Sequence, residues 1–467
     1  MSSTFFGISV AQSGLAAQRR AMDILGYNIA HANDPTYKRQ RMVMVEGAVL
    51  ATSQEASSVG VSAVGGGVSS GDVERIRDTL IENRLREATT SAASWNYTQN
   101  VMSQIETALG EPSDTGLQKD IDNFWASWQK VANSPDSSSI RTALLEDTSA
   151  LCQRMQYVYG QMQDTVSDLN LAVVDRVQQV NLIAGEIGKL NNEIGALSSG
   201  QMPVNDLLNR RDALVQELSK LVAISQHGSG VDNFIISIGG TALVQGTKVN
   251  KLETEVGTNG QQMVQWERDG EPVNISDGEL SAILTLRDET VPGYMEQLNN
   301  IATTLVAQVN AVHHTGQTIT NPPVAGGDFF KAGTTAANLS LDESIIDHPE
   351  LVAASTTAVN NAGIGDGSIA TAIAALKSTP VSGSLTINQM YSTLVGDIGS
   401  AAATANTQAE AHQLSVDQFT TQQQAVSGVS LDEEMTNMIK FQQAYNASAK
   451  VLSAMDEMLD ALITGMG

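Results

Sequence analysis

"SGVSLDEEMTNMIKFQQAYNASAKVLSAMDEMLDALITGMG", residues 427–467, is the stretch that decides the fold of this chain. Its apolar residues recur at alternating steps of three and four, the spacing that places side chains on one face of a helix. The resulting apolar seam consists of Leu431, Met435, Met438, Tyr445, Leu452, Met455, Leu459 and Leu462. The pattern predicts a long helix whose apolar face needs a partner.

A start signal precedes this helix. Ser430 and Glu433 have the spacing of a capping box, in which each side chain bonds the backbone amide of the other residue. Asp432, Glu433 and Glu434 lie in the first turn, where the positive end of the helix dipole favours acidic side chains. We therefore expect the helix to begin directly after Ser430.

The N-terminal segment carries a second seam with the same spacing. It includes Ile8, Leu15, Met22, Leu25 and Ile29. The pattern stops at Asn33, Asp34 and Pro35, because proline lacks an amide donor and disfavours helix in the residue before it. A terminal helix is therefore predicted at each end of the sequence.

The two terminal segments differ in charge. Residues 1–50 contain five Lys or Arg and three Asp or Glu, whereas residues 430–467 contain two and six. Complementary helices can pair, but a pair of isolated helices leaves much of each apolar face uncovered. We interpret both seams as an assembly interface, which stays loose in the monomer and becomes ordered when neighbouring copies supply the missing surface.

The middle of the chain reads as a helical body with one small β insert. A first helical region of this body is predicted from about Asp72, and Gly110 and Pro112 close it. Another helical region follows Ser134 and Pro135, and from Met162 to Leu197 the apolar residues keep the helical spacing, which predicts a rod of about 60 residues, about 85 Å long. Residues 204–222 predict a returning helix. Between 225 and 279 the period changes to two, with Gly239–Gly240 and Asp269–Gly270 as turn signals. Residues 317–380 predict irregular structure with a few strands.

These patterns predict an elongated, multi-domain fold that is mainly α with a smaller β part. The terminal helices form a coiled-coil-like pair, and the body is a long helical bundle. The predicted domains are a terminal helical domain of residues 1–50 with 428–467, a discontinuous helical body of 51–224 with 280–427, and an inserted β domain of 225–279. After the β insert, the helical pattern resumes at residues 278–289 and continues at 292–316.

Composition narrows the class of function. The 467 residues carry a formal net charge of -25, which predicts repulsion from nucleic acid. Lys38, Arg39 and Arg41 form a small basic cluster that we interpret as a solvated turn. Cys152 is the only cysteine, so no internal disulfide is possible. We expect neither a membrane-inserted span nor a cleaved signal peptide.

The sequence offers little support for catalysis. His313 and His314 are adjacent, so a helix would point them in different directions, and no His-Glu-x-x-His motif is present. Gly67–Gly71 matches Gly-x-Ser-x-Gly, but it lies in a Ser- and Gly-rich stretch that reads better as a linker. We expect no enzyme activity, no metal site and no cofactor.

Several blocks give the chain a recognisable resemblance. "SGLAAQRRAMDILGYNIAHAND", "YKRQ", "LLNRRDALVQELSKLV" and "SGVSLDEEMTNMIKFQQAYNASAKVLSAMDEMLDALI" are similar to blocks of the flagellar hook-associated protein 1 family. The terminal blocks resemble flagellar rod, hook and junction proteins in general, and the middle blocks narrow the choice. The chain departs from the family at "NDPTYKRQ", where Asp34 and Thr36 replace the usual threonine and glycine of the turn.

The resemblance implies a structural subunit of the bacterial flagellum. Such proteins form a homo-oligomeric ring between the hook protein and a second hook-associated junction protein, with terminal helices as inner tubes and the β domain outside. It also implies export through the flagellar type III apparatus to an extracellular location. A cytosolic export chaperone would bind the C-terminal helix through Leu431, Met438, Phe441, Tyr445, Leu452 and Leu459. The chain looks short for the family, so we expect one outer β domain.

Three alternatives remain at this point. Another flagellar axial protein, such as a hook, rod or second junction protein, would share the same terminal seams. A type III secreted effector or translocator would also be helical and chaperone-bound, but it should contain a membrane-seeking segment. An extracellular hydrolase on a flagellar scaffold should carry clustered His and Glu in the β insert, where His227 stands alone.

Overall fold

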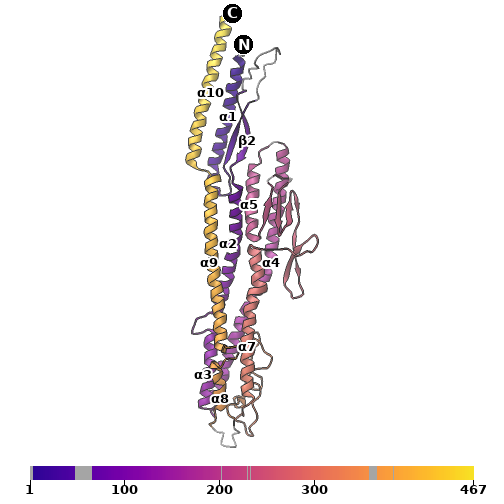
Figure 1. Ribbon diagram of the computed structural model, residues 1–467, viewed down its shortest axis with the longest axis vertical. Helices are drawn as coiled ribbons and strands as arrows, with labels where there is room; N and C mark the ends of the chain where they lie inside the picture. The colour runs from indigo at the N-terminus through magenta and orange to yellow at the C-terminus, as the bar shows by residue number, and fades with distance from the viewer. Residues whose placement is uncertain are drawn as a thin grey trace.

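The computed structural model describes residues 4–47, 66–200, 202–228, 230–231, 233–356, 365–381 and 383–466. The molecule is elongated, and its two termini lie at the same end (Figure 1). Helices α1 and α10 form this end, the remaining long helices run below them, and the β insert lies against one side. The predicted class, mainly α with a smaller β part, is confirmed.

Long helices make up most of the described chain. They are α1 (Thr4–Ala30), α2 (Thr79–Leu109), α3 (Leu117–Asn133), α4 (Ser138–Ser199), α5 (Asn205–Leu221), α6 (Glu279–Thr285), α7 (Val291–His313), α8 (Ser368–Ala375), α9 (Ile387–Ser427) and α10 (Leu431–Met466). A π-helical turn, η1 (Leu286–Thr290), joins α6 to α7, and short 3₁₀ turns lie at η2 (Pro349–Leu351) and η4 (Leu376–Ser378).

The predicted rod and its return are confirmed. Helix α4 has 62 residues, and its inward positions Val173, Val177 and Val180 are buried. Helix α5 runs back beside it, ending where Val222 becomes extended. A rod of this length is stabilised by its neighbours rather than by its own propensity. The neighbours include α2, α3, α5, α6, α7 and the β insert.

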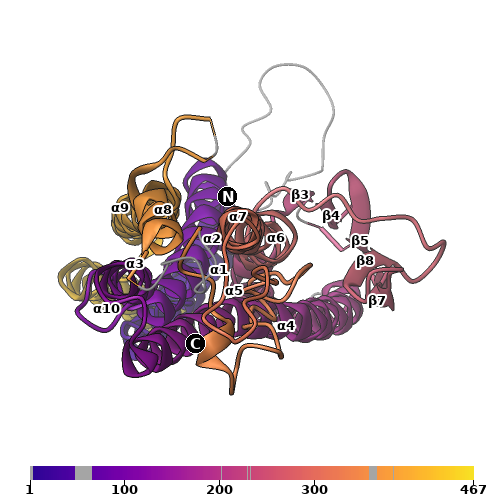
Figure 2. The same ribbon diagram turned by 90° about the horizontal axis from the view of Figure 1, so that it is seen from below.

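The β insert contains two antiparallel sheets within the described residues. One has the order β3 (Ser225–His227), β4 (Ile235–Ile238), β5 (Thr241–Gln245), β6 (Lys248–Val249), and the other pairs β7 (Leu252–Val256) with β8 (Gln262–Trp266). Gly239 and Gly240 have φ of 55° and 91° and join β4 to β5, as predicted for a two-residue hairpin turn. Figure 2 shows this insert on one flank of α4.

Side chains of α4 attach the insert to the rod. The amide of Asn181 donates to Leu252 O at 2.7 Å, and its oxygen accepts from Leu252 N at 2.9 Å. Val249 packs closely on Gly188, where a Cβ atom would lie only 2.9 Å from the valine side chain. The insert is therefore fixed to the outside of the rod by specific contacts.

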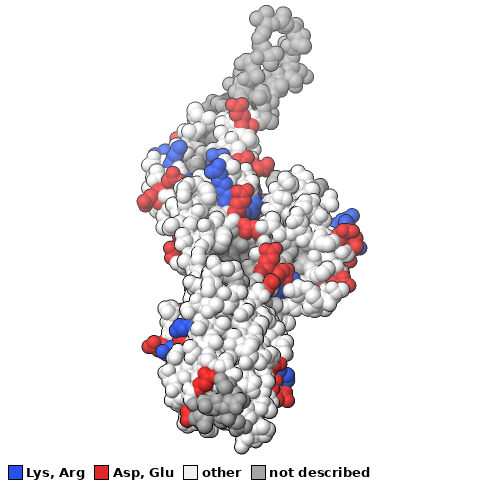
Figure 3. All heavy atoms as spheres, turned by 60° about the horizontal axis from the view of Figure 1, so that its bottom comes forward, with Lys and Arg blue, Asp and Glu red and all other residues white. Residues whose placement is uncertain are grey.

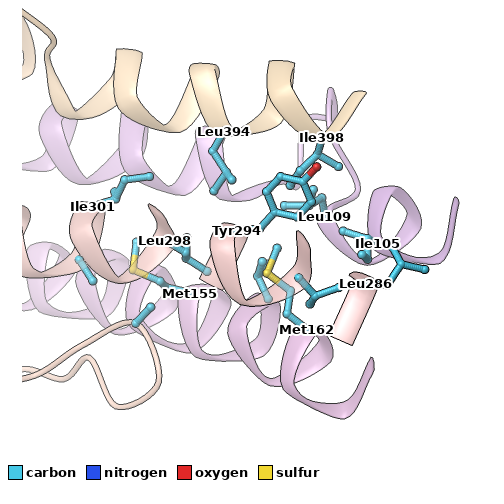
Figure 4. Close-up of a cluster of buried hydrophobic side chains, with 14 of the residues drawn as sticks. Ile105, Leu109, Met155, Met162, Leu286, Tyr294, Leu298, Ile301, Leu394 and Ile398 are labelled. Atoms are coloured by element: carbon cyan, nitrogen blue, oxygen red, sulfur yellow. The ribbon is translucent and has the colours of Figure 1, made fainter. Parts of the chain in front are cut away.

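The core of the body lies where α2, α4, α7 and α9 converge. Figure 4 shows side chains from these helices and from η1 pointing toward one another: Ile105, Leu109, Met155, Met162, Leu286, Tyr294, Leu298, Ile301, Leu394 and Ile398. All of them are buried. Residues from both halves of the sequence thus share one core.

Two features of the N-terminal half differ from the sequence prediction. Residues 72–75 were expected in a helix, but they belong to strand β2 (Val68–Arg75), which pairs with β1 (Gln40–Glu46). Helix α2 begins only at Thr79, after Asp78 caps it through Leu80 N and Ile81 N. The β1–β2 ladder packs on α1, so it belongs with the terminal helices. The proposed boundary at residue 50 lies outside the described residues.

The segment between α7 and α9 is largely irregular, as predicted, although α8 was missed. Asn310 on α7 bonds this segment through Phe329 N, Phe330 N and Phe330 O at 2.8 to 3.0 Å. His313 bonds Gly327 O and Ala353 N. Buried polar side chains of α7 therefore hold a segment that has little regular structure.

Candidate assembly interface

Helices α1 and α10 form an antiparallel pair beyond the body (Figure 1). Three close approaches give its register. A Cβ atom on Gly7 would lie 2.3 Å from the Met455 side chain, and a Cβ on Gly14 would lie 3.4 Å from Ser448 Oγ. At the base, Asn28 Nδ2 donates to Glu434 Oε2 at 2.8 Å. The two terminal seams were thus correctly expected to pair.

The α1 face of this pair differs in detail from the predicted seam. Leu25 is buried, whereas Ile8, Leu15, Met22 and Ile29 are only partly buried. The most buried side chains of α1 are small or polar: Ala11, Ala17, Ala21 and Asn28. The predicted seam followed the large apolar residues only. It missed the small residues that recur every seven positions, Gly7, Gly14 and Ala21, a spacing that continues to Asn28. These small residues let the helices approach closely.

On α10, some predicted seam residues are covered and others are open. Met438, Tyr445, Leu452, Met455 and Leu459 are partly buried, as is Phe441. Leu431 and Met435, which begin the predicted seam, are 51% and 50% exposed. The side chain of Leu462 lies outside the described residues. The covered face at the base is instead centred on Glu434, which is fully buried.

Further apolar side chains of α10 point away from α1. Ile439, Val451 and Met458 are 53%, 47% and 56% exposed. The sequence seam did not include them because it followed a single face. An isolated helix with apolar side chains on several faces is typical of one that is surrounded by other helices. Helix α1 covers only one of these faces.

A buried polar network fastens the base of the pair. Asn28, completely buried, donates to Gln40 O at 2.9 Å and accepts from Gln40 N at 3.0 Å and from Tyr37 Oη at 2.7 Å. Its amide also binds Glu434, as described above. Burial raises the pKa of the Tyr37 hydroxyl, which therefore stays protonated as a donor. Every hydrogen-bonding atom of Asn28's side chain is thus used to tie α1, β1 and α10 together.

Arg39 reinforces this network and changes the interpretation of the helix start. Its Nη1 lies 2.5 Å from Glu433 Oε2, and its Nε lies 2.7 Å from Glu434 Oε1. Helix α10 begins at Leu431, as expected, with Glu434 N bonded to Ser430 O at 3.0 Å. The predicted capping box is wrong, because among the described hydrogen bonds none joins the Ser430 hydroxyl to Glu433, whose carboxylate pairs with Arg39. A capping box does occur at Thr386 and Gln389, at the start of α9.

The basic cluster is not a solvated turn. Lys38 is buried, 4.0 Å from Glu82 of α2, and burial lowers its pKa. Arg77 also pairs with Glu82, and Arg75 pairs with Asp212 of α5 at 2.8 Å. Of the predicted basic residues only Arg41 is well exposed. These ion pairs join the terminal unit, which consists of α1, α10, β1 and β2, to the body. The sequence did not predict the pairs, because the partner residues are distant in the chain.

The unusual turn after α1 has its own explanation. Asp34 Oδ1 accepts from Thr36 N at 2.9 Å and from Thr36 Oγ1 at 2.7 Å, and these bonds lower the pKa of Asp34. His31 stacks on Tyr37 with ring centroids 4.9 Å apart. Tyr27 donates to Asp206 of α5 at 2.6 Å, which raises its pKa to about 12. Asp34 and Thr36 thus stabilise this turn by bonding each other.

The described residues supply no candidate for metal chemistry. No group of three His, Cys, Asp or Glu side chains in this part of the chain is arranged to hold a metal ion. Within the same residues, no helix is both long and apolar enough to cross a membrane. On the face in Figure 3, acidic and basic side chains are interspersed without a broad basic patch. Among the described residues, the α1–α10 pair therefore remains as the candidate functional site.

Comparison with known proteins gives a consistent picture. Residues 102–330 match the family described as the flagellar hook-associated protein FlgK helical domain, and residues 422–465 match that of the flagellar basal body rod FlgEFG protein C-terminal. Flagellar hook-associated protein 1 of Bacillus subtilis (strain 168) is 29% identical, with 100% of this chain and 99% of the relative covered. The protein of the same name from Escherichia coli (strain K12) is 28% identical, with 98% and 99% covered.

A solved structure has the same fold. It is described as the flagellar hook junction protein FlgK from Burkholderia pseudomallei, with a TM-score of 0.66 and 17% sequence identity. It covers 74% of this chain, and all of the solved chain is matched. The alignment with the Escherichia coli relative spans 553 positions, more than the 467 residues of this chain, so some of its gaps fall here. Over nearly its full length the chain is thus similar to flagellar hook-associated protein 1 of Bacillus subtilis and Escherichia coli, and residues 102–330 match the FlgK helical domain.

Proposed function

We propose that this chain is a structural subunit of the bacterial flagellum that forms the junction between hook and filament and is required for filament assembly. The observation that carries the proposal is the antiparallel α1–α10 pair. It extends beyond the body, is fastened by the buried Asn28–Glu434 contact, and leaves apolar flanks of α10 uncovered. The names of the full-length relatives support a hook-associated role, and the solved structure with the same fold is described as a hook junction protein.

The same pair supports self-assembly into a ring. Leu431, Met435 and Ile439 each leave about half of their surface exposed, although they are large apolar residues on one helix. Contiguous exposed apolar surface typically marks a protein interface. Neighbouring copies would cover it. The hook protein would contact the ring on one side and the second hook-associated junction protein on the other.

Export and chaperone binding belong to the same proposal. The protein would leave the cytoplasm through the flagellar type III apparatus without a cleaved signal peptide and act outside the cell. A cytosolic chaperone would bind α10 through the residues that the family resemblance assigns. Because Met438, Phe441, Tyr445, Leu452 and Leu459 are partly buried against α1, that chaperone has to compete with α1 for them.

A second candidate is another flagellar axial protein, such as a hook or rod subunit. The match of residues 422–465 to rod proteins favours it, but that match covers only the end of α9 and most of α10. The helical-domain match at 102–330 favours the junction protein. We propose no catalytic role, in keeping with a structural family.

Deleting the gene distinguishes these candidates. We expect cells with normal hooks that shed unpolymerised flagellin into the medium, as seen by electron microscopy and immunoblotting. Absence of hooks would instead identify a rod or hook subunit. Complementation with wild type should restore filaments, whereas Leu452→Asp should not, because it places a charge in the α1–α10 contact. Leu171→Asp, on the exposed face of α4, is the matched control and should complement.

A further inference from the structure

The uncovered surface of α10 consists of two separate stripes. The proximal stripe contains Leu431, Met435 and Ile439, near the body. The distal stripe contains Val451 and Met458 together with Ala447, Ala454 and Ala461, all exposed. At about 100° per residue, the two stripes and the face toward α1 are each about 120° apart. Helix α10 therefore has three apolar faces, and its own molecule covers one.

The two stripes differ in shape in a complementary way. The proximal stripe has large side chains at a spacing of four residues, which forms a raised ridge. The distal stripe has three alanines at a spacing of seven, so its surface is low between Val451 and Met458. A ridge of large residues packs well into a low, alanine-lined surface. If two proximal ridges packed on each other instead, large side chains would lie against large side chains.

Charge at the stripes agrees with this pairing. Asp432 lies beside the proximal ridge, and Lys450 lies beside the start of the distal stripe. Both are exposed, and in the part of the chain that the structure describes neither takes part in an ion pair. Placing the ridge of one copy on the distal stripe of another brings these opposite charges together.

We propose that α10 of one copy packs in parallel on α10 of the next, with its proximal ridge seated on the neighbour's distal stripe. The midpoints of the stripes, Met435 and Ala454, are 19 residues apart in sequence. Neighbouring copies are therefore displaced along the helix axis by about 29 Å, at a rise of about 1.5 Å per residue. The stagger also places Ile439 of one copy beside Met458 of the next. This inference rests on the proposed self-assembly and adds its register.

The contact is heterologous, because two different surfaces of the same chain meet. Heterologous contacts propagate from copy to copy, and an axial displacement at each step makes the path helical rather than flat. Both stripes lie on the side of α10 that faces away from α1. Assembly by this route leaves the α1–α10 pair intact.

Disulfide crosslinking in cells tests the stagger directly. Two variants, Ile439→Cys and Met458→Cys, are co-expressed in the gene-deletion strain, one with an affinity tag, and assembled flagella are mildly oxidised. Native Cys152 stays in place, because it is buried and burial raises its pKa to about 12. We expect a crosslinked dimer containing both variants, at least tenfold above the dimer formed by either variant alone.

The matched control is Ile439→Cys with Lys440→Cys, because Lys440 lies only one residue further along α10 and about 100° around the helix from Ile439. Crosslinking of this pair at the level of the first would overturn the stagger, and so would a first pair that does not crosslink although filaments grow. If either variant blocks filament growth, Met435→Cys with Ala454→Cys tests the same register. Failure of wild type to restore filaments would instead contradict the proposed function, which separates the two outcomes.

Discussion

At the scale of single residues, the carboxylate of Glu434 decides how α10 leaves the body. It is fully buried and binds Asn28 while lying against Arg39. Removing it leaves one of the two Asn28 amide hydrogens without an acceptor, while the other still donates to Gln40 O. Unsatisfied buried polar groups cost about 1 to 3 kcal/mol each.

Glu434→Leu is therefore expected to lower the free energy of opening of the α1–α10 pair by about 1 to 3 kcal/mol. Hydrogen exchange of the α10 amides measures this opening. Glu433→Gln is the control, because the Glu433 side chain is 61% exposed and surface ion pairs contribute at most about 1 kcal/mol. Equal effects of the two variants would contradict the role assigned to the buried network.

His313 makes a second residue-scale prediction. Its Nδ1 donates to Gly327 O at 2.6 Å, and its Nε2 accepts from Ala353 N at 2.8 Å, so the native state requires the neutral ring. Burial lowers its pKa to about 4. Because the folded-state pKa lies below the usual value of about 6.5, the unfolded chain binds more protons between these values. The stabilisation is complete above the unfolded pKa and is lost as pH falls toward the folded one.

Wild type should thus lose about 2 kcal/mol of unfolding free energy between pH 7 and pH 5 through this residue. Urea unfolding followed by tryptophan fluorescence measures the loss. His313→Gln should remove most of that pH dependence whatever its effect at pH 7. His314→Gln should keep it, because the His314 side chain is half exposed. A pH dependence unchanged in His313→Gln would rule out this source.

At the scale of elements, the break between α9 and α10 depends on Gly428. Its backbone is extended, and a Cβ atom there would lie 2.4 Å from Gln424 O. Alanine at this position must displace backbone, which typically costs about 1 to 3 kcal/mol. Gly396 in the same α9 has open space around its Cα.

Gly428→Ala should accordingly lower the melting temperature, whereas Gly396→Ala should raise the unfolding free energy by about 0.5 to 1 kcal/mol by favouring helix. Differential scanning calorimetry of the two variants compares them directly. If Gly428→Ala stabilised the protein as much as Gly396→Ala, the close approach at the break would not constrain the chain.

The elements that the sequence predicted well are those with a local pattern. The 62-residue α4, the return of α5 and the Gly239–Gly240 hairpin follow from the spacing of neighbouring residues. The β1–β2 ladder was missed because its strands are separated by a long stretch of sequence, and pairing across such a distance has no local signal. Helix α8 was missed because its Ala-rich stretch is short.

The terminal helices were also predicted in outline, because their apolar residues follow a local pattern. Periodicity located the terminal helices and many of their apolar residues. It could not reveal that Arg39 pairs with Glu433 and Glu434, or that Lys38 lies against Glu82, because these partners come from distant segments. It also overlooked Gly7 and Gly14, whose contribution is the absence of a side chain.

At the scale of the whole molecule, the body buries its apolar side chains within one chain, whereas the terminal unit leaves apolar surface exposed. The body buries a continuous core that draws on α2, α4, α7 and α9 (Figure 4). The terminal unit is a two-helix layer with a small β ladder, attached by ion pairs and hydrogen bonds. Its outer apolar surface remains exposed in the single chain. We infer that assembly completes the packing of this unit and leaves the body unchanged.

Cysteine alkylation of Met435→Cys in the free protein and in detached hook–filament structures measures most directly whether assembly covers α10. The account predicts rapid labelling by a maleimide in the free protein and at least tenfold slower labelling after assembly. Leu171→Cys on α4, 68% exposed, should react rapidly in both states, and the buried Cys152 in neither. Equal labelling of Met435→Cys before and after assembly would contradict the claim that neighbouring copies cover α10.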